Sequence, residues 1–327
     1  MIYRRLGNSG LQLSALSLGS WITFGNQIDD HCAHDLMARA YDAGINYFDN
    51  AEGYAAGRSE ELMGRILSKL HWPRDTYVVS SKVFWGGDRP NQTGLSKKHV
   101  IEACHGAMRR LRVDYLDLYV CNHPDPNTPI EETVRAMDLL VRQGKVLYWG
   151  TSEWSAQQIT EAHEITIRHN LVPPNVEQAQ YKLLCRKRVE EEYKPLYSDI
   201  GLGLTSASPL AAGYLTGKYN QGIPENSRLS RPENVWLLQR WERLRSRGLV
   251  QVLEKLSAIA VKIGYPLPAL AVAWSLKNLD VSSVITGASA VDQLDQNLVA
   301  LELLGHLNEE IMSEIDAAIG DFSEFDA

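Results

Sequence analysis

The chain of 327 residues has few cysteines and no closely spaced pair of them. Cys32, Cys104, Cys121 and Cys185 are far apart, and no Cys-x-x-Cys pair occurs. Structural zinc sites and disulfide-rich domains need cysteines at short, recurring spacings. We therefore expect no metal site and no disulfide, and four free thiols are typical of a reducing compartment.

Long apolar runs and a basic excess are also lacking. The segment Met1–Gly7 has no signal-peptide core, and no stretch is apolar for long enough to cross a bilayer. The net charge is -7, so no basic face is available to neutralise nucleic-acid phosphates. We expect a cytoplasmic protein that inserts into no membrane and binds no nucleic acid.

What the chain does contain is a regular alternation of short apolar runs and amphipathic segments. Val/Leu/Ile-rich runs of this kind predict buried strands, and apolar residues at helical spacing predict helices. The predicted strands are Ser14–Ser20, the run Ile45–Phe48 leading into Asp49, Tyr77–Val83, Tyr115–Cys121, Val146–Thr151, Val176–Tyr181, Leu202–Ser206 and Ser283–Thr286. The predicted helices are Asp29–Gly44, Ser59–Leu70, Lys97–Arg112, Pro129–Gly144, Ala156–Asn170, Val189–Asp199 and Val291–Leu304.

Eight strand–helix units favour an α/β fold of the (β/α)8 TIM barrel type in a single domain, residues 1–327. The segment Arg4–Leu13 predicts an N-terminal β-hairpin, and we expect extra helices after strands 7 and 8. The insertion Pro209–Gly248 interrupts the pattern, and its run Arg240–Arg247 is interpreted as a solvated helix face. A doubly wound sheet is the weaker alternative, because no Gly-x-Gly-x-x-Gly turn follows the first strand.

Polar side chains follow two of the predicted strands. Asp49 and Tyr54 come after one strand, and Lys82 lies at the end of the next. Barrel enzymes keep their chemistry at this end of the strands. If the three meet, Asp49 holds Lys82, and Lys82 lowers the pKa of Tyr54 so that the phenol can exchange a proton. Singly, each residue has an ordinary alternative as a turn residue, a packing residue or a solvated cation.

The sequence around these residues resembles that of the aldo-keto reductases. Asp49 and Tyr54 stand five apart and are followed by Ser59-Glu60-Glu61-Leu62-Met63-Gly64. Three longer runs, residues 122–137, 148–152 and 282–289, are similar to the branch that contains the beta subunits of voltage-gated potassium channels. The likeness extends over most of the chain, roughly residues 3–320.

The resemblance implies a catalytic set of Asp49, Tyr54, Lys82 and Asn122. Asn122 stands where most of the superfamily has a histidine, and an amide donates a hydrogen bond but does not shuttle a proton. Tyr54 would then carry the proton alone. Strand alternation predicts that His123 points away from the site. Trp21, Phe24, Trp85 and Trp154 follow strand ends and are candidates for an apolar pocket.

The resemblance also implies a nicotinamide cofactor, with NADPH favoured because Lys218 and Arg228 could hold a 2'-phosphate. It places the nicotinamide on Ser152 and Gln178, and the adenosine end before the last helix, where free N–H groups face an anion. Two departures are Ala207, where the family has a stacking aromatic residue, and Glu153. The implied cofactor-binding residues are Ser20, Trp21, Gln27, Asp49, Ser152, Gln178, Ser208, Pro209, Leu210, Gly213, Lys218, Arg228, Gly287, Ser289, Gln293, Gln296 and Asn297.

Two functions of different classes follow. The first is an NADPH-dependent reductase of aldehydes or ketones with Tyr54 as general acid. The second is a nucleotide-sensing regulatory subunit, similar to a channel beta subunit, that keeps NADP(H) and turns over slowly. We rank the enzyme first because a fold alone does not imply a partner. A barrel that has lost activity is a third alternative, and a homo-oligomer is expected only by analogy with the branch.

Overall fold

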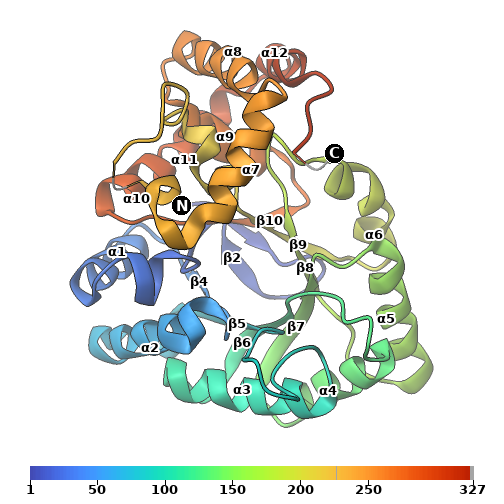
Figure 1. Cartoon of the computed structure of the whole chain (residues 1–327). Helices are drawn as coiled ribbons and strands as arrows, with labels where there is room; N and C mark the ends of the chain where they lie inside the picture. The colour runs from blue at the N-terminus through green and yellow to red at the C-terminus, as the bar shows by residue number, and fades with distance from the viewer. Residues whose placement is uncertain (226, 325–327) are drawn as a thin grey trace.

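The central feature of the computed structural model is a closed barrel of eight parallel strands (Figure 1). The structure describes residues 1–225 and 227–324, so residue 226 and the last three residues of the predicted domain 1–327 lie outside the described residues. Each barrel strand pairs in parallel with the next one along the chain, and β10 closes the ring against β3. The predicted (β/α)8 architecture is confirmed.

The strands and helices begin and end as follows. The hairpin strands are β1 (Tyr3–Arg5) and β2 (Gln12–Ser14), and the barrel strands are β3 (Leu16–Gly19), β4 (Tyr47–Asp49), β5 (Val78–Val83), β6 (Leu116–Cys121), β7 (Val146–Ser152), β8 (Val176–Gln180), β9 (Gly203–Ala207) and β10 (Val281–Thr286). The helices are α1 (Asp30–Asp42), α2 (Arg58–Leu70), α3 (Lys97–Leu111), α4 (Ile130–Arg142), α5 (Ala156–His169), α6 (Lys194–Asp199), α7 (Val235–Ser246), α8 (Leu249–Lys262), α9 (Leu267–Lys277), α10 (Val291–Leu298), α11 (Ala300–Leu303) and α12 (Glu309–Ile319).

Burial on both faces explains why the barrel strands are continuous apolar runs in the sequence. Every residue of β5, β6 and β10 is buried, because one face lines the barrel interior and the other packs under helices. Local capping fixes several helix starts. Asp29 accepts a hydrogen bond from Cys32 N at the start of α1, and Ser155 with Gln158 forms a capping box at α5.

The predicted hairpin closes the amino-terminal end of the barrel. β1 and β2 pair antiparallel, and Leu6 and Leu13 are fully buried in one cluster with Tyr47 and Val120 of the barrel strands. Apolar side chains therefore fill this end. The chemistry is left to the opposite end, where the carboxyl ends of the strands lie.

Two expectations about helices need correction. The predicted helix Val189–Asp199 is a π-helical turn, Arg188–Glu192, followed by α6. Pro195 lies in the first turn of α6, where its missing N–H costs least, and it could not continue a preceding helix. The predicted helix Val291–Leu304 is also divided, into α10 and α11.

The extra helices follow the seventh and eighth barrel strands as predicted, with α7 to α9 after β9 and α10 to α12 after β10. α8 and α12 lie side by side at the top of Figure 1. The interpretation of Arg240–Arg247 as a solvated helix face holds for Glu242, Arg243, Arg245, Ser246 and Arg247, which are exposed, but not for the whole run. Trp241 and Leu244 are buried, and Arg240 pairs with Glu324 at 3.0 Å, because one face of α7 packs on the core.

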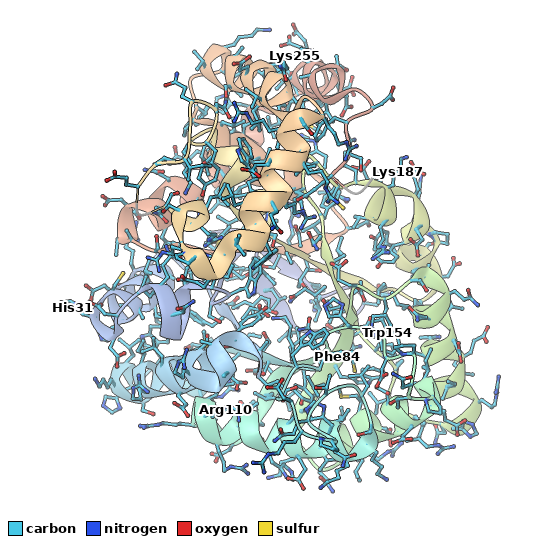
Figure 2. The ribbon with its side chains drawn as sticks, viewed as in Figure 1. His31, Phe84, Arg110, Trp154, Lys187 and Lys255 are labelled. Carbon is cyan, nitrogen blue, oxygen red and sulfur yellow. The ribbon has the colours of Figure 1, made fainter. Side chains whose placement is uncertain are left out.

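Figure 2 shows the side chains on the same ribbon. Lys187 and Lys255 lie at the periphery and are exposed, whereas Phe84 and Trp154 are buried. Among the described residues, no single helix has both the length and the apolar composition needed to cross a bilayer. Only α8 and α9 taken together have that length and composition, and this pair is bent by 88°.

Candidate active site

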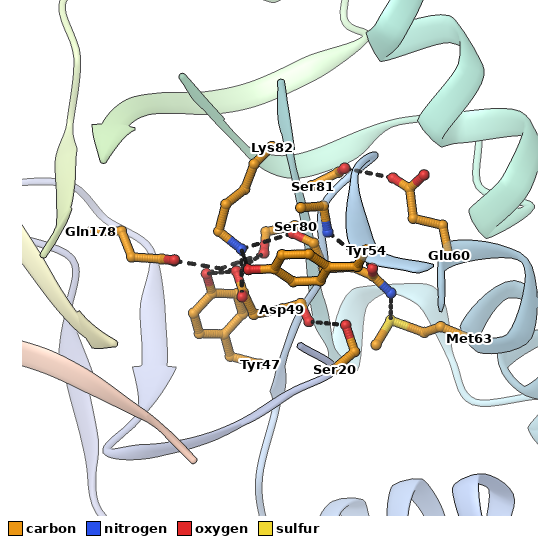
Figure 3. Close-up of polar contacts among 12 residues, drawn as sticks. Ser20, Tyr47, Asp49, Tyr54, Glu60, Met63, Ser80, Ser81, Lys82 and Gln178 are labelled. Carbon is orange, nitrogen blue, oxygen red and sulfur yellow. Dashed lines mark hydrogen bonds and ion pairs between the residues drawn. The ribbon is translucent and has the colours of Figure 1, made fainter. Parts of the chain in front are cut away.

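Asp49, Tyr54 and Lys82 meet at the carboxyl end of the barrel. Asp49 ends β4, and Lys82 lies on the adjacent strand β5. The Lys82 Nζ atom donates to Asp49 Oδ2 at 2.6 Å, to the Asn50 carbonyl oxygen at 2.8 Å and to Tyr54 Oη at 3.2 Å (Figure 3). These three acceptors match the three protons of an ammonium group. The buried cation is therefore fully hydrogen-bonded.

The second oxygen of Asp49 is held just as firmly. Asp49 Oδ1 accepts from Ser80 Oγ at 2.8 Å, from Tyr47 Oη at 3.2 Å and from Gln178 Nε2 at 3.2 Å. The hydroxyl of Ser20 donates to the Asp49 backbone carbonyl at 2.9 Å. With these partners the Asp49 side chain keeps a fixed orientation.

The pKa shifts in this cluster differ from the sequence prediction in one respect. Burial raises the pKa of Tyr54 above its ordinary value, and this effect outweighs the opposing effect of Lys82. The predicted net lowering of the Tyr54 pKa is therefore wrong, although the direction of the Lys82 contribution is as predicted. Burial alone would lower the pKa of Lys82, but Asp49 and Tyr54 raise it. At neutral pH the cluster thus contains an ammonium and a protonated phenol.

The turn after Tyr54 has an unusual backbone. Ala55, Ala56 and Gly57 have φ values of 51°, 54° and 85°, in the left-handed region. For alanine this conformation costs about 1 kcal/mol or more, so the surrounding structure must hold it in place. The turn leads directly into α2 at Arg58 and fixes where the tyrosine ring leaves the chain.

A cavity of about 840 Å³ opens at this end of the barrel, within the range of about 300–1,000 Å³ that is typical of small-molecule sites. Its wall includes Asp49, Tyr54 and Asn122. Sixteen of the seventeen implied cofactor-binding residues line it: Trp21, Gln27, Asp49, Ser152, Gln178, Ser208, Pro209, Leu210, Gly213, Lys218, Arg228, Gly287, Ser289, Gln293, Gln296 and Asn297. Ser20 and Lys82 are not in the wall but are buried behind Asp49 and Tyr54.

Two cations of the cavity wall, Lys218 and Arg228, form no ion pair with an acidic side chain anywhere in the described part of the chain. Desolvation and the neighbouring Arg228 lower the pKa of Lys218, and burial lowers that of Arg228. Two partly desolvated cations that repel each other favour an anion between them. This part of the wall is suited to a phosphate group.

The two departures from the family pattern both face the cavity. Ala207 ends β9 in the cavity wall, so no aromatic ring stands at this position. Glu153 Oε1 accepts a hydrogen bond from Gln180 N at 2.7 Å, and Arg188 lies 3.3 Å from its other oxygen. Glu153 therefore fixes the end of β8, which explains a charged residue at this position.

Three expectations about the pocket were wrong. His123 lines the cavity together with Asn122, because β6 ends at Cys121 and strand alternation no longer applies beyond it. Its ring packs edge-on against Phe84 and Trp85. Phe24 and Trp154 are core residues, each only 1% exposed, and both belong to the main apolar cluster; Trp21 and Trp85 do line the cavity.

Several cavity residues were not identified from the sequence. Gln180 and Lys182 follow Gln178 at intervals of two, so strand alternation could have placed them on the same face. Trp236 and Arg240 reach the cavity from α7, and the ring centroids of Trp236 and Trp21 are 6.2 Å apart. No residue pattern in the insertion would have predicted this contact.

Comparison with known proteins agrees with this geometry. The model of the Aldo/keto reductase family matches residues 15–319. A relative described as "Probable voltage-gated potassium channel subunit beta" from Oryza sativa subsp. japonica is 49% identical over 324 residues, which cover 98% of this chain and 97% of the relative. A protein with the same description from Arabidopsis thaliana is 48% identical over 324 residues, with the same coverage.

Proposed function

This chain belongs to the aldo/keto reductase family, and we propose that it is an NADPH-dependent reductase of aldehydes or ketones, an oxidoreductase with Tyr54 as the general acid. The observation that carries the proposal is the position of Tyr54 Oη, 3.2 Å from a buried ammonium and in the wall of a cavity that also holds the cation pair Lys218 and Arg228. A proton donor and a phosphate site thus share one cavity.

The residues of the wall fit a dinucleotide with a phosphate at one end. Lys218 and Arg228 would hold the phosphate charge, and Ser289 offers a hydroxyl near the start of α10. At the other end, Gln178 donates its amide hydrogen to Asp49 and so keeps its amide oxygen available to accept from a carboxamide. Ser152 lies beside it on β7. Bound NADPH would supply the hydride that reduces the carbonyl carbon.

The protein's own residues then handle the proton and the developing charge. Tyr54 is protonated at neutral pH and donates its phenolic proton to the alkoxide oxygen as that oxygen gains charge. Lys82 stabilises the phenolate that is left, and Asp49 keeps Lys82 charged and in place. The Asn122 amide can donate a hydrogen bond to the same substrate oxygen but takes no part in proton transfer.

The experiment that tests the proposal is cofactor oxidation by the purified protein with a panel of small aldehydes and ketones. We expect carbonyl-dependent oxidation of NADPH, with NADH used less well because it lacks the 2'-phosphate that Lys218 and Arg228 would hold. Oxidation of neither cofactor by any carbonyl compound would overturn the assignment.

The names of the relatives favour a second candidate, a cofactor-binding subunit that associates with a membrane channel and turns over slowly. The same cavity would serve to retain the nucleotide. The two candidates differ in the release of NADP+: a regulatory subunit should release it slowly and co-purify with a channel, whereas an enzyme should turn over many times without a partner. Fast multiple turnover by the isolated protein favours the reductase.

A further inference from the structure

A second buried ion pair lies beside the site, between Glu52 and His99. Glu52 stands between Asp49 and Tyr54 in the sequence, and His99 lies in the first turn of α3. The side chains are 6% and 5% exposed, and His99 Nε2 lies 3.2 Å from Glu52 Oε1. The reductase mechanism proposed above uses neither residue.

The hydrogen bonds of His99 define its protonation state. Its Nδ1 atom lies 2.8 Å from the Gly94 carbonyl oxygen, which can only accept, so Nδ1 carries a proton. Its Nε2 atom faces the Glu52 carboxylate, which also only accepts when ionised. With Glu52 ionised, both contacts are satisfied together only if the imidazole is doubly protonated. The pair is therefore an imidazolium with a carboxylate.

The pair connects two loops that both reach the cavity. Glu52 N donates to the Lys82 carbonyl at 3.2 Å, and Glu52 Oε1 accepts from Phe84 N at 2.8 Å. Tyr54 follows Glu52 by two residues, and Trp85, 53% exposed in the cavity wall, follows Phe84. One carboxylate thus joins the segment that carries the proton donor to the segment that carries Trp85.

The packing around the pair leaves little freedom. A Cβ atom at Gly86 would lie 2.8 Å from both Glu52 Oε2 and His99 Nε2, and one at Gly53 would lie 2.9 Å from the Trp85 carbonyl oxygen. Contacts this short require glycine at both positions. The two loops are therefore in direct contact over the ion pair, and a movement of one would be transmitted to the other.

We propose that the Glu52–His99 ion pair is a positioning unit for the reaction: it fixes the position of the Tyr54 hydroxyl relative to the Trp85 ring at the cavity mouth. The inference rests on the proposed reductase function for its kinetic consequences. Neither side chain touches the reacting atoms, so both act through Tyr54. Misplacement of a reacting group by about 1 Å can cost on the order of 100-fold in rate.

The same geometry makes the positioning dependent on pH. When His99 loses its Nε2 proton, two lone pairs face each other and the contact with Glu52 becomes repulsive. The other ionisable groups around the pair are Glu60 on α2, Cys104 on α3, Tyr119 on β6 and Asp125 after β6. Burial raises the pKa of Cys104 to about 12 and raises that of Tyr119 well above its ordinary value. Burial would raise the pKa of Asp125, but backbone N–H groups lower it by more, so these three groups do not titrate near neutral pH.

Two substitutions of Glu52 separate a positioning role from general stability. Glu52→Ala removes the link. Glu52→Gln keeps the link without the charge: the amide oxygen at the Oε1 position can accept from both Phe84 N and the protonated Nε2 of His99, but it stabilises the imidazolium less than a carboxylate does. A matched control is Asp117→Ala at the amino-terminal end of β6. Asp117 also accepts from a strand N–H, that of Val79, and pairs with a cation, Arg74, but it does not line the cavity.

The experiment measures the single-turnover rate per folded molecule and the NADPH affinity. It also measures the titration of Tyr54, which is the difference in tyrosinate absorbance between each protein and the same protein carrying Tyr54→Phe. Glu52→Ala should lower the rate about 10- to 100-fold with unchanged NADPH affinity and should shift the Tyr54 titration. Glu52→Gln should keep most of the rate at low pH but should lose it at a lower pH than the wild type, because the neutral amide stabilises the His99 imidazolium less. Asp117→Ala should lose stability but not rate.

A wild-type rate and Tyr54 titration in Glu52→Ala, or equal losses of rate in Glu52→Ala and Asp117→Ala, would overturn the positioning role. So would the same pH dependence in Glu52→Gln as in the wild type. If the wild type oxidises no NADPH with any carbonyl compound, the proposed function fails, whereas the Tyr54 titration in the three variants still tests the positioning unit by itself.

Discussion

The Nζ atom of Lys82 lies 3.2 Å from the phenolic oxygen of Tyr54, inside hydrogen-bonding distance although the two residues are 28 positions apart. The contact exists because β4 and β5 are adjacent in the barrel and because the turn after Tyr54 directs its ring back over β5. Burial raises the pKa of Tyr54, and the buried ammonium opposes this rise and stabilises the phenolate once it forms. Tyr54 can therefore release a proton when a substrate oxygen gains charge.

Removal of the Asp49 charge should destabilise the fold. In Asp49→Asn the Lys82 ammonium, 1% exposed, would lose its counter-ion at 2.6 Å. Breaking a buried pair from one side costs about 3–5 kcal/mol, so we expect a loss of this size in the free energy of unfolding by urea. Glu131→Gln, which breaks the exposed pair with Arg135, is the control and should be indistinguishable from the wild type. Equal stability of the two variants would show that the Lys82 site relaxes.

Replacement of Lys218 or Arg228 by Met should weaken NADPH binding more than NADH binding. A hydrogen bond to a charged group contributes about 1.5–3 kcal/mol, so each replacement should raise the Kd of NADPH roughly 10-fold or more. Fluorescence titration with both cofactors provides the comparison. Equal weakening of both cofactors would place these cations on a phosphate that NADH also carries.

Ala207→Trp should tighten NADPH binding. Ala207 lines the cavity beside Ser208, and an indole there could stack on a nicotinamide ring. Stacking contributes about 1 kcal/mol beyond buried area, which corresponds to roughly a 5-fold lower Kd. Ala207→Leu is the control for added volume without a flat ring. Weaker binding in the Trp variant than in the Leu variant would show that the space is needed for the cofactor.

The stability contributed by His99 should decline with rising pH. Burial lowers the pKa of His99, but the Glu52 carboxylate raises it by more, so its folded pKa is above the ordinary 6.5. Its contribution is therefore complete below pH 6.5 and is lost as the pH rises through the folded pKa. We expect the difference in unfolding free energy between wild type and His99→Gln to shrink as the pH rises above 6.5 and through the folded pKa of His99. A constant difference would mean that His99 is neutral in the fold.

Much of the fold was predictable because each barrel strand is a short run buried on both faces. The catalytic cluster was predictable for a related reason: parallel neighbouring strands bring their carboxyl ends to one edge, so Asp49 and Lys82 had to lie close together. The pairing of Glu52 with His99 was not predictable, because α3 follows a loop and no pattern in the loop sequence indicates its path.

The errors have identifiable physical causes. The net pKa of Tyr54 depends on how deeply its ring is buried, and burial is a property of the assembled barrel rather than of the local sequence. His123 was misplaced because alternation was extended two residues past the end of β6. The buried face of α7 was missed because its apolar residues Trp241 and Leu244 are embedded in a run of arginines.

The most direct measurement is the single-turnover rate of NADPH oxidation by a carbonyl substrate in the wild type and in Tyr54→Phe. General acid catalysis typically contributes about 100- to 10,000-fold, so the variant should lose at least about 100-fold in rate. Its NADPH affinity should stay unchanged, because Lys82 and Asp49 remain paired and the cofactor contacts lie elsewhere in the cavity. An undiminished rate in Tyr54→Phe would contradict the assignment of Tyr54 as the proton donor.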